Sequence, residues 1–165
     1  MRKDGAMIVI GYQGIGKSTI AGTNNCIDLE SGNFWIPGRH TMLRDKDWYK
    51  PYCNIALHLH QQGYIVMISS HEVVRNYLKE IASEEDKNAI FVCFPDKSLQ
   101  IPWTNKLWTR YEETQKVKDH KAWRNAEDRY QENIRELELC GFKKIVLDTM
   151  NYSLLDEIES AKKRI

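Results

Sequence analysis

A short apolar run that passes directly into a glycine-rich loop constrains the fold more than any other feature of this sequence. Residues 7–10 read Met-Ile-Val-Ile, and residues 11–18 then fit the pattern G-x-x-x-x-G-K-[ST] without a mismatch. Glycines allow a tight turn that brings backbone N–H groups close to a polyphosphate, and the start of a helix adds the positive end of its dipole. The pattern therefore predicts a strand, a phosphate-binding loop (P-loop) and a helix in succession.

Each part of this loop has an expected role. Lys17 is expected to reach the β- and γ-phosphates of ATP, and the Ser18 hydroxyl is expected to hold Mg²⁺. The alternative is a glycine-rich turn with an incidental lysine, which the apolar run immediately before the loop disfavours. The residues predicted to bind the nucleotide are Gly11, Gln13, Gly14, Ile15, Gly16, Lys17, Ser18 and Thr19.

Size and charge fit one compact domain that is not a general nucleic-acid binder. The 165 residues, of which 42% are hydrophobic, suffice for a single core. The 24 lysines and arginines nearly balance the 23 aspartates and glutamates, so a global basic field is not expected. The four cysteines are widely spaced, which favours a reducing, cytoplasmic setting. Apolar runs fall short of the ~20 residues that a membrane span requires, so we expect neither a membrane anchor nor a signal peptide.

Strand-like and helix-like patterns alternate along the chain. Short runs rich in Ile, Val and Phe predict buried strands, and between them apolar residues recur with the spacing of amphipathic helices. Alternation of this kind implies right-handed crossovers and a mostly parallel sheet with helices on both faces, an α/β fold. The predicted strands are residues 7–10, 26–29, 64–69, 89–94 and 144–147, and the predicted helices include residues 52–59, 74–81, 123–137 and 154–158.

Two long stretches interrupt this alternation. Residues 31–47 contain two glycines and a proline beside aromatic residues, and residues 95–121 contain two prolines among many charges. Both are long for plain connectors. In an open parallel sheet the ligand crevice lies beyond the carboxyl ends of the strands, where such excursions leave the sheet. We therefore expect one domain, residues 1–165, in which residues 31–62 cover the acceptor and residues 95–121 form a lid.

With its loop Gly-Tyr-Gln-Gly-Ile-Gly-Lys-Ser-Thr at the first strand, the chain resembles the small P-loop kinases, most closely the nucleoside-monophosphate kinase group that includes adenylate kinase. Residues 91–96, followed by Leu107 and Arg110, look like the fourth strand of that group, its proline turn and the helix that enters the lid. Residues 141–147 look like its last strand. The resemblance implies a three-layer P-loop NTPase fold with a five-stranded parallel sheet of order 2-3-1-4-5 and a lid after strand 4.

The sequence departs from this group after the third predicted strand. Adenylate kinases have Asp-Gly-Phe-Pro-Arg there, whereas this chain has Ser69-Ser70-His71, with Arg75 one helical turn further on. A carboxylate that would assist Mg²⁺ binding is also missing at this position. Mg²⁺ is expected to be held by Ser18, the ATP phosphates and water, since this ion retains most of its hydration.

Polar residues after the second and third strands make up the predicted acceptor site. Asp28 is placed to take a proton from an attacking hydroxyl or to bind a sugar hydroxyl, with a solvated turn as the alternative. Arg75 is placed to grip an acceptor phosphate with its planar fork, with an ordinary solvated arginine as the alternative. The predicted acceptor-binding residues are Asp28, Glu30, Ser31, Arg44, Tyr52, His71 and Arg75.

Phosphoryl transfer needs cations beside Lys17 that spread over the migrating group, and the resemblance implies that lid arginines supply them on closure. Arg110 and Arg124 are the predicted lid cations, although a mixed charge run is more typical of a solvated helix face. The predicted function is ATP- and Mg²⁺-dependent phosphoryl transfer to a small molecule, with a (deoxy)nucleoside monophosphate as the leading acceptor. The alternatives are a kinase of a hydroxyl acceptor, such as a nucleoside or metabolite, and a nucleotide-binding switch or ATPase. Neither nucleic acid nor a membrane is expected as a partner.

Overall fold

The computed structural model describes residues 4–29 and 46–165, and these contain one sheet of five parallel strands. Strand β1 (Met7–Gly11) is central, between β3 (Ile65–Ser69) and β4 (Ile90–Pro95). The outer strands are β2 (Cys26–Asp28), which pairs with β3, and β5 (Lys143–Leu147), which pairs with β4. The predicted α/β class, the parallel sheet and the order 2-3-1-4-5 are confirmed.

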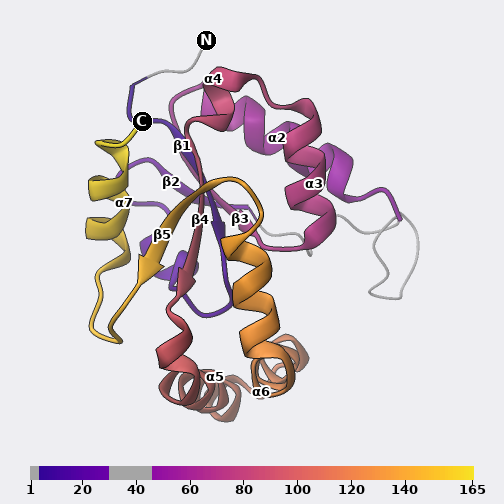
Figure 1. The fold of residues 1–165 in the computed structure, drawn as a ribbon, viewed down its shortest axis with the longest axis vertical. Coiled ribbons are helices and arrows are strands. Elements are labelled where there is room, and N and C mark those ends of the chain that lie inside the picture. The colour runs from indigo at the N-terminus through magenta and orange to yellow at the C-terminus, as the bar shows by residue number, and fades with distance from the viewer. Residues whose placement is uncertain (1–3, 30–45) are drawn as a thin grey trace.

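Helices lie on both sides of this sheet (Figure 1). In the described ranges they are α1 (Lys17–Ile20), α2 (Tyr49–Gln61), α3 (Glu72–Ile81), α4 (Glu84–Lys87), α5 (Gln100–Thr114), α6 (Val117–Glu138) and α7 (Leu154–Lys162), with the 3₁₀ turn η2 (Lys97–Leu99). Figure 1 shows α7 on one side of the sheet and α2 and α3 on the other. Helices α5 and α6 form a hairpin that extends beyond the carboxyl ends of the strands. Among the described residues, no helix combines the length and apolar character needed to cross a membrane.

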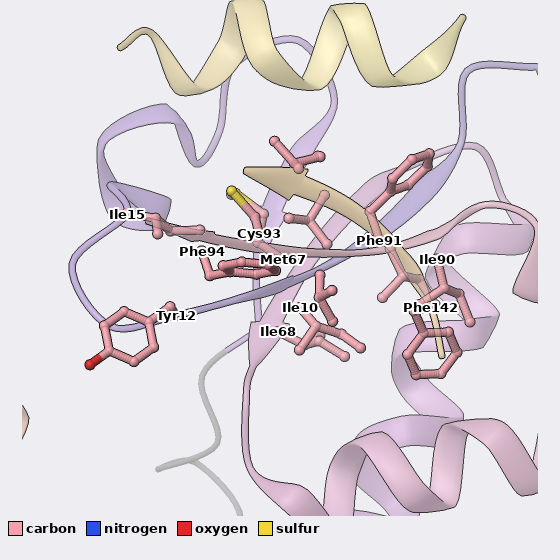
Figure 2. Close-up of a cluster of buried hydrophobic side chains, with 14 of the residues drawn as sticks. Ile10, Tyr12, Ile15, Met67, Ile68, Ile90, Phe91, Cys93, Phe94 and Phe142 are labelled. Carbon is pink, nitrogen blue, oxygen red and sulfur yellow. The ribbon is translucent and has the colours of Figure 1, made fainter. Parts of the chain in front are cut away.

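The apolar pattern of the strands explains their places in the sheet. Every residue of β1 and β4 is buried, because a strand covered by helices on both faces must be apolar along its length. In β5, by contrast, Ile145 and Leu147 are buried while Lys144 and Val146 are exposed, as suits an edge strand. Figure 2 shows side chains from β1, β3 and β4 packed together, with Tyr12 and Ile15 at the end where the chain leaves β1. The core thus anchors the first residues of the glycine-rich loop.

The structure differs most from the sequence expectations between β4 and β5. The helix expected to enter the lid is α5, which contains Leu107 and Arg110, and α6 begins at Val117 instead of near Trp123. Pro102 is compatible with α5 because it lies in the first turn, where its missing N–H would have no helical partner. Helix α6 is interrupted at Arg129, where the backbone leaves the helical region (φ −137°, ψ 21°). The short helix α4 was not predicted either.

Candidate active site

A cavity of about 500 Å³ opens at the carboxyl ends of β1, β2 and β3, facing the hairpin of α5 and α6. The glycine-rich loop, residues 11–18, forms one wall. The remaining lining residues come from other parts of the chain and are Asp28, Leu29, Ser69, Ser70, His71, Glu72, Arg75, Leu107, Arg110, Lys118, Asp119, Ala122, Asn125, Asn133, Glu136 and Leu137. The fold therefore brings Asp28, His71, Arg75 and Arg110, four of the predicted site residues, to the same cavity as the loop.

The glycines of the loop are needed for two different reasons. A Cβ at Gly11 would lie 2.4 Å from Ile15 Cδ1, and one at Gly14 would lie 2.8 Å from Leu107 Cδ2, so a side chain at either position would force a buried neighbour to shift. Gly14 (φ 86°) and Gly16 (φ 102°) also adopt the left-handed region that glycine enters without penalty. Among the described residues, no hydrogen-bond partner is found for the N–H groups of Gly14, Ile15 and Gly16. Consecutive amides of this kind form a site for an anion.

The helix after the loop is much shorter than the motif suggests. Helix α1 has four residues, and it ends because Ala21 is extended (ψ 137°). Gly22, Asn24 and Asn25 then have positive φ, a conformation that Gly and Asn adopt at the lowest cost. A single helical turn provides only a small part of a helix dipole, so the expected contribution of that dipole is limited in this chain.

Tyr52 joins the ends of β2 and β3 beside the cavity. It is buried, and its hydroxyl donates a hydrogen bond to the Leu29 carbonyl (2.8 Å) and accepts one from the Ser69 N–H (2.9 Å). Burial raises the pKa of Tyr52 to about 12, so the hydroxyl remains a donor near neutral pH. Tyr52, predicted to contact the acceptor, instead lies outside the cavity lining and connects the end of β2 to the end of β3.

Arg75 points into the cavity from α3 although it is only 7% exposed. Its Nε donates to the Ser70 carbonyl at 3.0 Å, and its Nη2 lies 3.6 Å from Glu136 Oε2. A guanidinium has five N–H groups, so these contacts leave donors for a ligand. Next to it, His71 Nδ1 lies 2.8 Å from Ser69 Oγ. The two side chains are thus fixed at the carboxyl end of β3.

The two predicted lid cations occupy different environments. Arg110 lines the cavity, with its Nε 3.3 Å from Asp119 Oδ1. Arg124 lies outside the cavity, with its side chain 65% exposed and its Nε 3.1 Å from Asp128 Oδ2 on the same helix. Of these two arginines, Arg110 lies beside the cavity and Arg124 does not. The predicted residues Glu30, Ser31 and Arg44 lie outside the described residues.

The charges that line the cavity are balanced within the described part of the chain. The cationic residues are Lys17, Arg75, Arg110 and Lys118, and the acidic residues are Asp28, Glu72, Asp119 and Glu136. Ser18 is exposed at the end of the loop, where its hydroxyl is accessible to a hydrated cation. In residues 4–29 and 46–165, no group of three or more His, Cys, Asp or Glu side chains is arranged to hold a metal ion.

Sequence reasoning missed the polar residues that reach the cavity from α6. Gln13 Nε2 donates to Asn125 Oδ1 at 3.1 Å, and Asn133 Nδ2 donates to the same oxygen, so the loop is linked to this helix. The apolar spacing of α6 predicted its buried face, but a polar residue beside that face has the same pattern whether it lines a cavity or faces solvent. Only the packing of α6 across the loop shows which polar residues line the cavity and which face solvent.

Comparison with models of known protein families gives no match for this sequence, and comparison with curated proteins gives no significant match. The chemistry of the cavity residues is therefore the basis for assigning a function.

Proposed function

We propose that this chain is an ATP- and Mg²⁺-dependent phosphotransferase with a P-loop NTPase fold that acts on a small-molecule acceptor. The observation that carries the proposal is the shared cavity: the loop amides, Lys17 and Ser18 open into the same space as Asp28, His71 and Arg75. Amides and a lysine suit a polyphosphate donor. Polar side chains from β2, β3 and α3 suit a second, smaller ligand. A cavity for two ligands supports transfer between them over nucleotide binding alone.

In this proposal the loop amides and Lys17 bind the β- and γ-phosphates, and Arg110 approaches the transferred group from α5. Ser18, the phosphate oxygens and water would hold Mg²⁺, which would neutralise part of the phosphate charge. An acceptor oxygen attacks the γ-phosphorus and forms a new P–O bond, while the bond to the β,γ-bridging oxygen breaks and ADP leaves. The protein contributes by positioning both ligands and by offsetting the charge that spreads over the migrating group.

A (deoxy)nucleoside monophosphate is the acceptor that we propose first. Arg75 supports it, because this nearly buried guanidinium lines the cavity and retains N–H groups for an anionic oxygen. A phosphate acceptor carries its own anionic oxygen, so the transfer would need no protein base.

A hydroxyl acceptor is the second candidate, and one observation favours it. Glu136 already pairs with Arg75, so part of the arginine's charge is neutralised before any ligand binds. The carboxylate of Asp28 lines the same cavity and would take the proton that an attacking hydroxyl must lose.

A coupled assay of ADP release tests the proposal. The protein is incubated with ATP and Mg²⁺, alone and with ribo- and deoxyribonucleoside monophosphates, nucleosides or small hydroxylated metabolites, and the Lys17→Ala protein serves as the control. We expect slow turnover with ATP alone and a marked increase with one acceptor. Turnover that no acceptor raises would contradict the proposal and favour a hydrolytic switch or ATPase instead.

A further inference from the structure

We infer that Trp103 and Tyr152 are positioning residues for phosphate binding. They bind carbonyl groups of the glycine-rich loop and thereby direct the amides on the opposite side of the loop into the cavity. This inference rests on the proposed function, since it assumes that the loop binds the phosphates of a nucleotide. Neither residue stands out in the sequence, and the two lie about a third of the chain apart, on α5 and on the connection between β5 and α7.

Both side chains bind loop carbonyls directly. Trp103 Nε1 donates to the Gln13 carbonyl at 2.8 Å, and the Tyr152 hydroxyl donates to the Ile15 carbonyl at 2.7 Å and lies 3.4 Å from the Gly14 carbonyl. The two rings are stacked, with centroids 6.0 Å apart and an angle of 16° between their planes. Three consecutive carbonyls of the loop therefore face one aromatic pair.

The geometry of the peptide bond relates the direction of these carbonyls to the direction of the loop amides. In a trans peptide the C=O of one residue and the N–H of the next point in opposite directions. Carbonyls of residues 13–15 that face the aromatic pair thus direct the N–H groups of residues 14–16 the other way. These are the Gly14, Ile15 and Gly16 amides that have no partner among the described residues, in a loop that lines the cavity.

The loop needs this external support because α1 is short. A helix of four residues is not stable by itself, since the first turn fixes several residues for a single hydrogen bond. The loop is instead held by buried groups of α5: Trp103, which is fully buried, donates to a loop carbonyl, and Leu107 packs where a Cβ of Gly14 would lie. The aromatic pair therefore stabilises the loop conformation that a longer helix would otherwise stabilise.

Lys106 completes the arrangement on the solvent side. Its Nζ lies 4.2 Å from the centre of the Trp103 ring and 3.1 Å from the Tyr152 hydroxyl, to which it donates. The hydroxyl accepts from Lys106 and therefore directs its own proton to Ile15. Burial raises the pKa of Tyr152, which keeps this proton in place.

The test compares two tyrosine-to-phenylalanine variants that lose equivalent hydrogen bonds. Tyr152→Phe removes the bond to the loop and keeps the ring. Tyr130→Phe is the matched control, because the Tyr130 hydroxyl donates to the Asp96 carbonyl, also at 2.7 Å, at the base of the hairpin. Isothermal titration calorimetry measures binding of Mg·ATP and of tripolyphosphate, which lacks the base and sugar, and calorimetric melting measures stability.

We expect Tyr152→Phe to weaken binding of both probes about three- to tenfold, the effect of one ordinary hydrogen bond. Tyr130→Phe should lower the melting temperature about as much as Tyr152→Phe does, and it should leave both affinities unchanged. Trp103→Phe, if it folds, should weaken both probes in the same way as Tyr152→Phe.

Equal affinity of Tyr152→Phe and wild type for both probes would overturn the inference while leaving the proposed function intact. An equal loss of affinity in Tyr130→Phe would also overturn it, because the effect would then be one of general stability. Wild-type protein that binds neither probe would refute the proposed function, and the inference would fall with it.

Discussion

The two sides of the cavity are built in opposite ways. The proposed donor side is one continuous segment, residues 11–18, in which glycine conformations set the backbone and the backbone amides, with Lys17, would bind the phosphates. The acceptor side gathers side chains from the ends of β2 and β3 and from α3, and Tyr52 connects two of these elements through the Leu29 carbonyl and the Ser69 N–H. A loop that binds a ligand through its backbone tolerates few sequences. A site that binds through side chains can change its ligand with a single substitution.

This difference teaches where specificity can reside. In the proposed function a polyphosphate is bound by amides that every residue type carries and by one cation, Lys17, so the donor side needs correct glycine conformations and this lysine. The acceptor side depends on the chemistry of Asp28, His71 and Arg75, and each substitution there alters which ligand fits. We therefore expect donor-side and acceptor-side variants to affect different kinetic constants.

The largest effect is expected for Lys17→Ala, which removes the cation of the donor loop. Phosphoryl transfer should fall by about 10³-fold or more, because Lys17 offsets charge on the transferred group. The fold should remain intact, since Lys17 lies outside the apolar core. The coupled assay measures kcat/KM and calorimetry measures Tm, with the exposed Lys121→Ala as a matched control. Near-normal turnover with a normal Tm would contradict the donor-site assignment.

Asp28→Asn distinguishes the two acceptor classes. With a hydroxyl acceptor, kcat should fall by about 10²-fold, because the general base is lost. With a phosphate acceptor, the same change should act mainly on the acceptor KM through a lost hydrogen bond. Steady-state kinetics with the best acceptor decide between them. We expect the second outcome, and a large fall in kcat at constant KM would refute a monophosphate substrate.

Arg110→Ala should reduce kcat by roughly 10- to 100-fold, because it removes a cation that lines the cavity. Arg124→Ala should change kcat by less than about twofold, since its exposed pair with Asp128 contributes little. Both variants are compared at saturating ATP and acceptor. If Arg124→Ala were the more damaging, α6 would have to move far enough to bring Arg124 to the phosphates, and our assignment of Arg110 would be wrong.

A smaller effect than that of Arg110→Ala is expected for Tyr52→Phe, the acceptor-side counterpart of Tyr152→Phe. Loss of the hydroxyl that joins Leu29 to Ser69 should raise the acceptor KM about two- to tenfold. The KM for ATP should not change, because the hydrogen bonds of the Tyr52 hydroxyl go to Leu29 and Ser69, outside residues 11–18. Measuring both constants in Tyr52→Phe and Tyr152→Phe gives a reciprocal test. Equal changes of both constants in both variants would show that the two sides do not act separately.

Much of the fold was predictable because its signals are local. The strand runs in the sequence correspond to β1–β5 within about one residue at each end, a normal margin for such boundaries. The bounds of helix α5 were harder to predict, because Pro95 and Pro102 interrupt the apolar pattern, although each is compatible with its place in the structure. Proline stops a helix only beyond its first turn, and composition alone does not say where that turn begins.

The sequence by itself determined the donor loop, the alternation of strands and helices and the charge balance of the chain. Each of these depends on neighbouring residues, on glycine conformation or on the period of apolar side chains. The tertiary structure decided which polar groups meet: it brought Arg110 to the cavity and left Arg124 in solvent, and it set Trp103 and Tyr152 against the carbonyls of residues 13–15. Contacts between residues 90 or more positions apart depend on how α5, α6 and the β5–α7 connection pack around β1, and the packing of whole elements leaves no signature in a local sequence pattern.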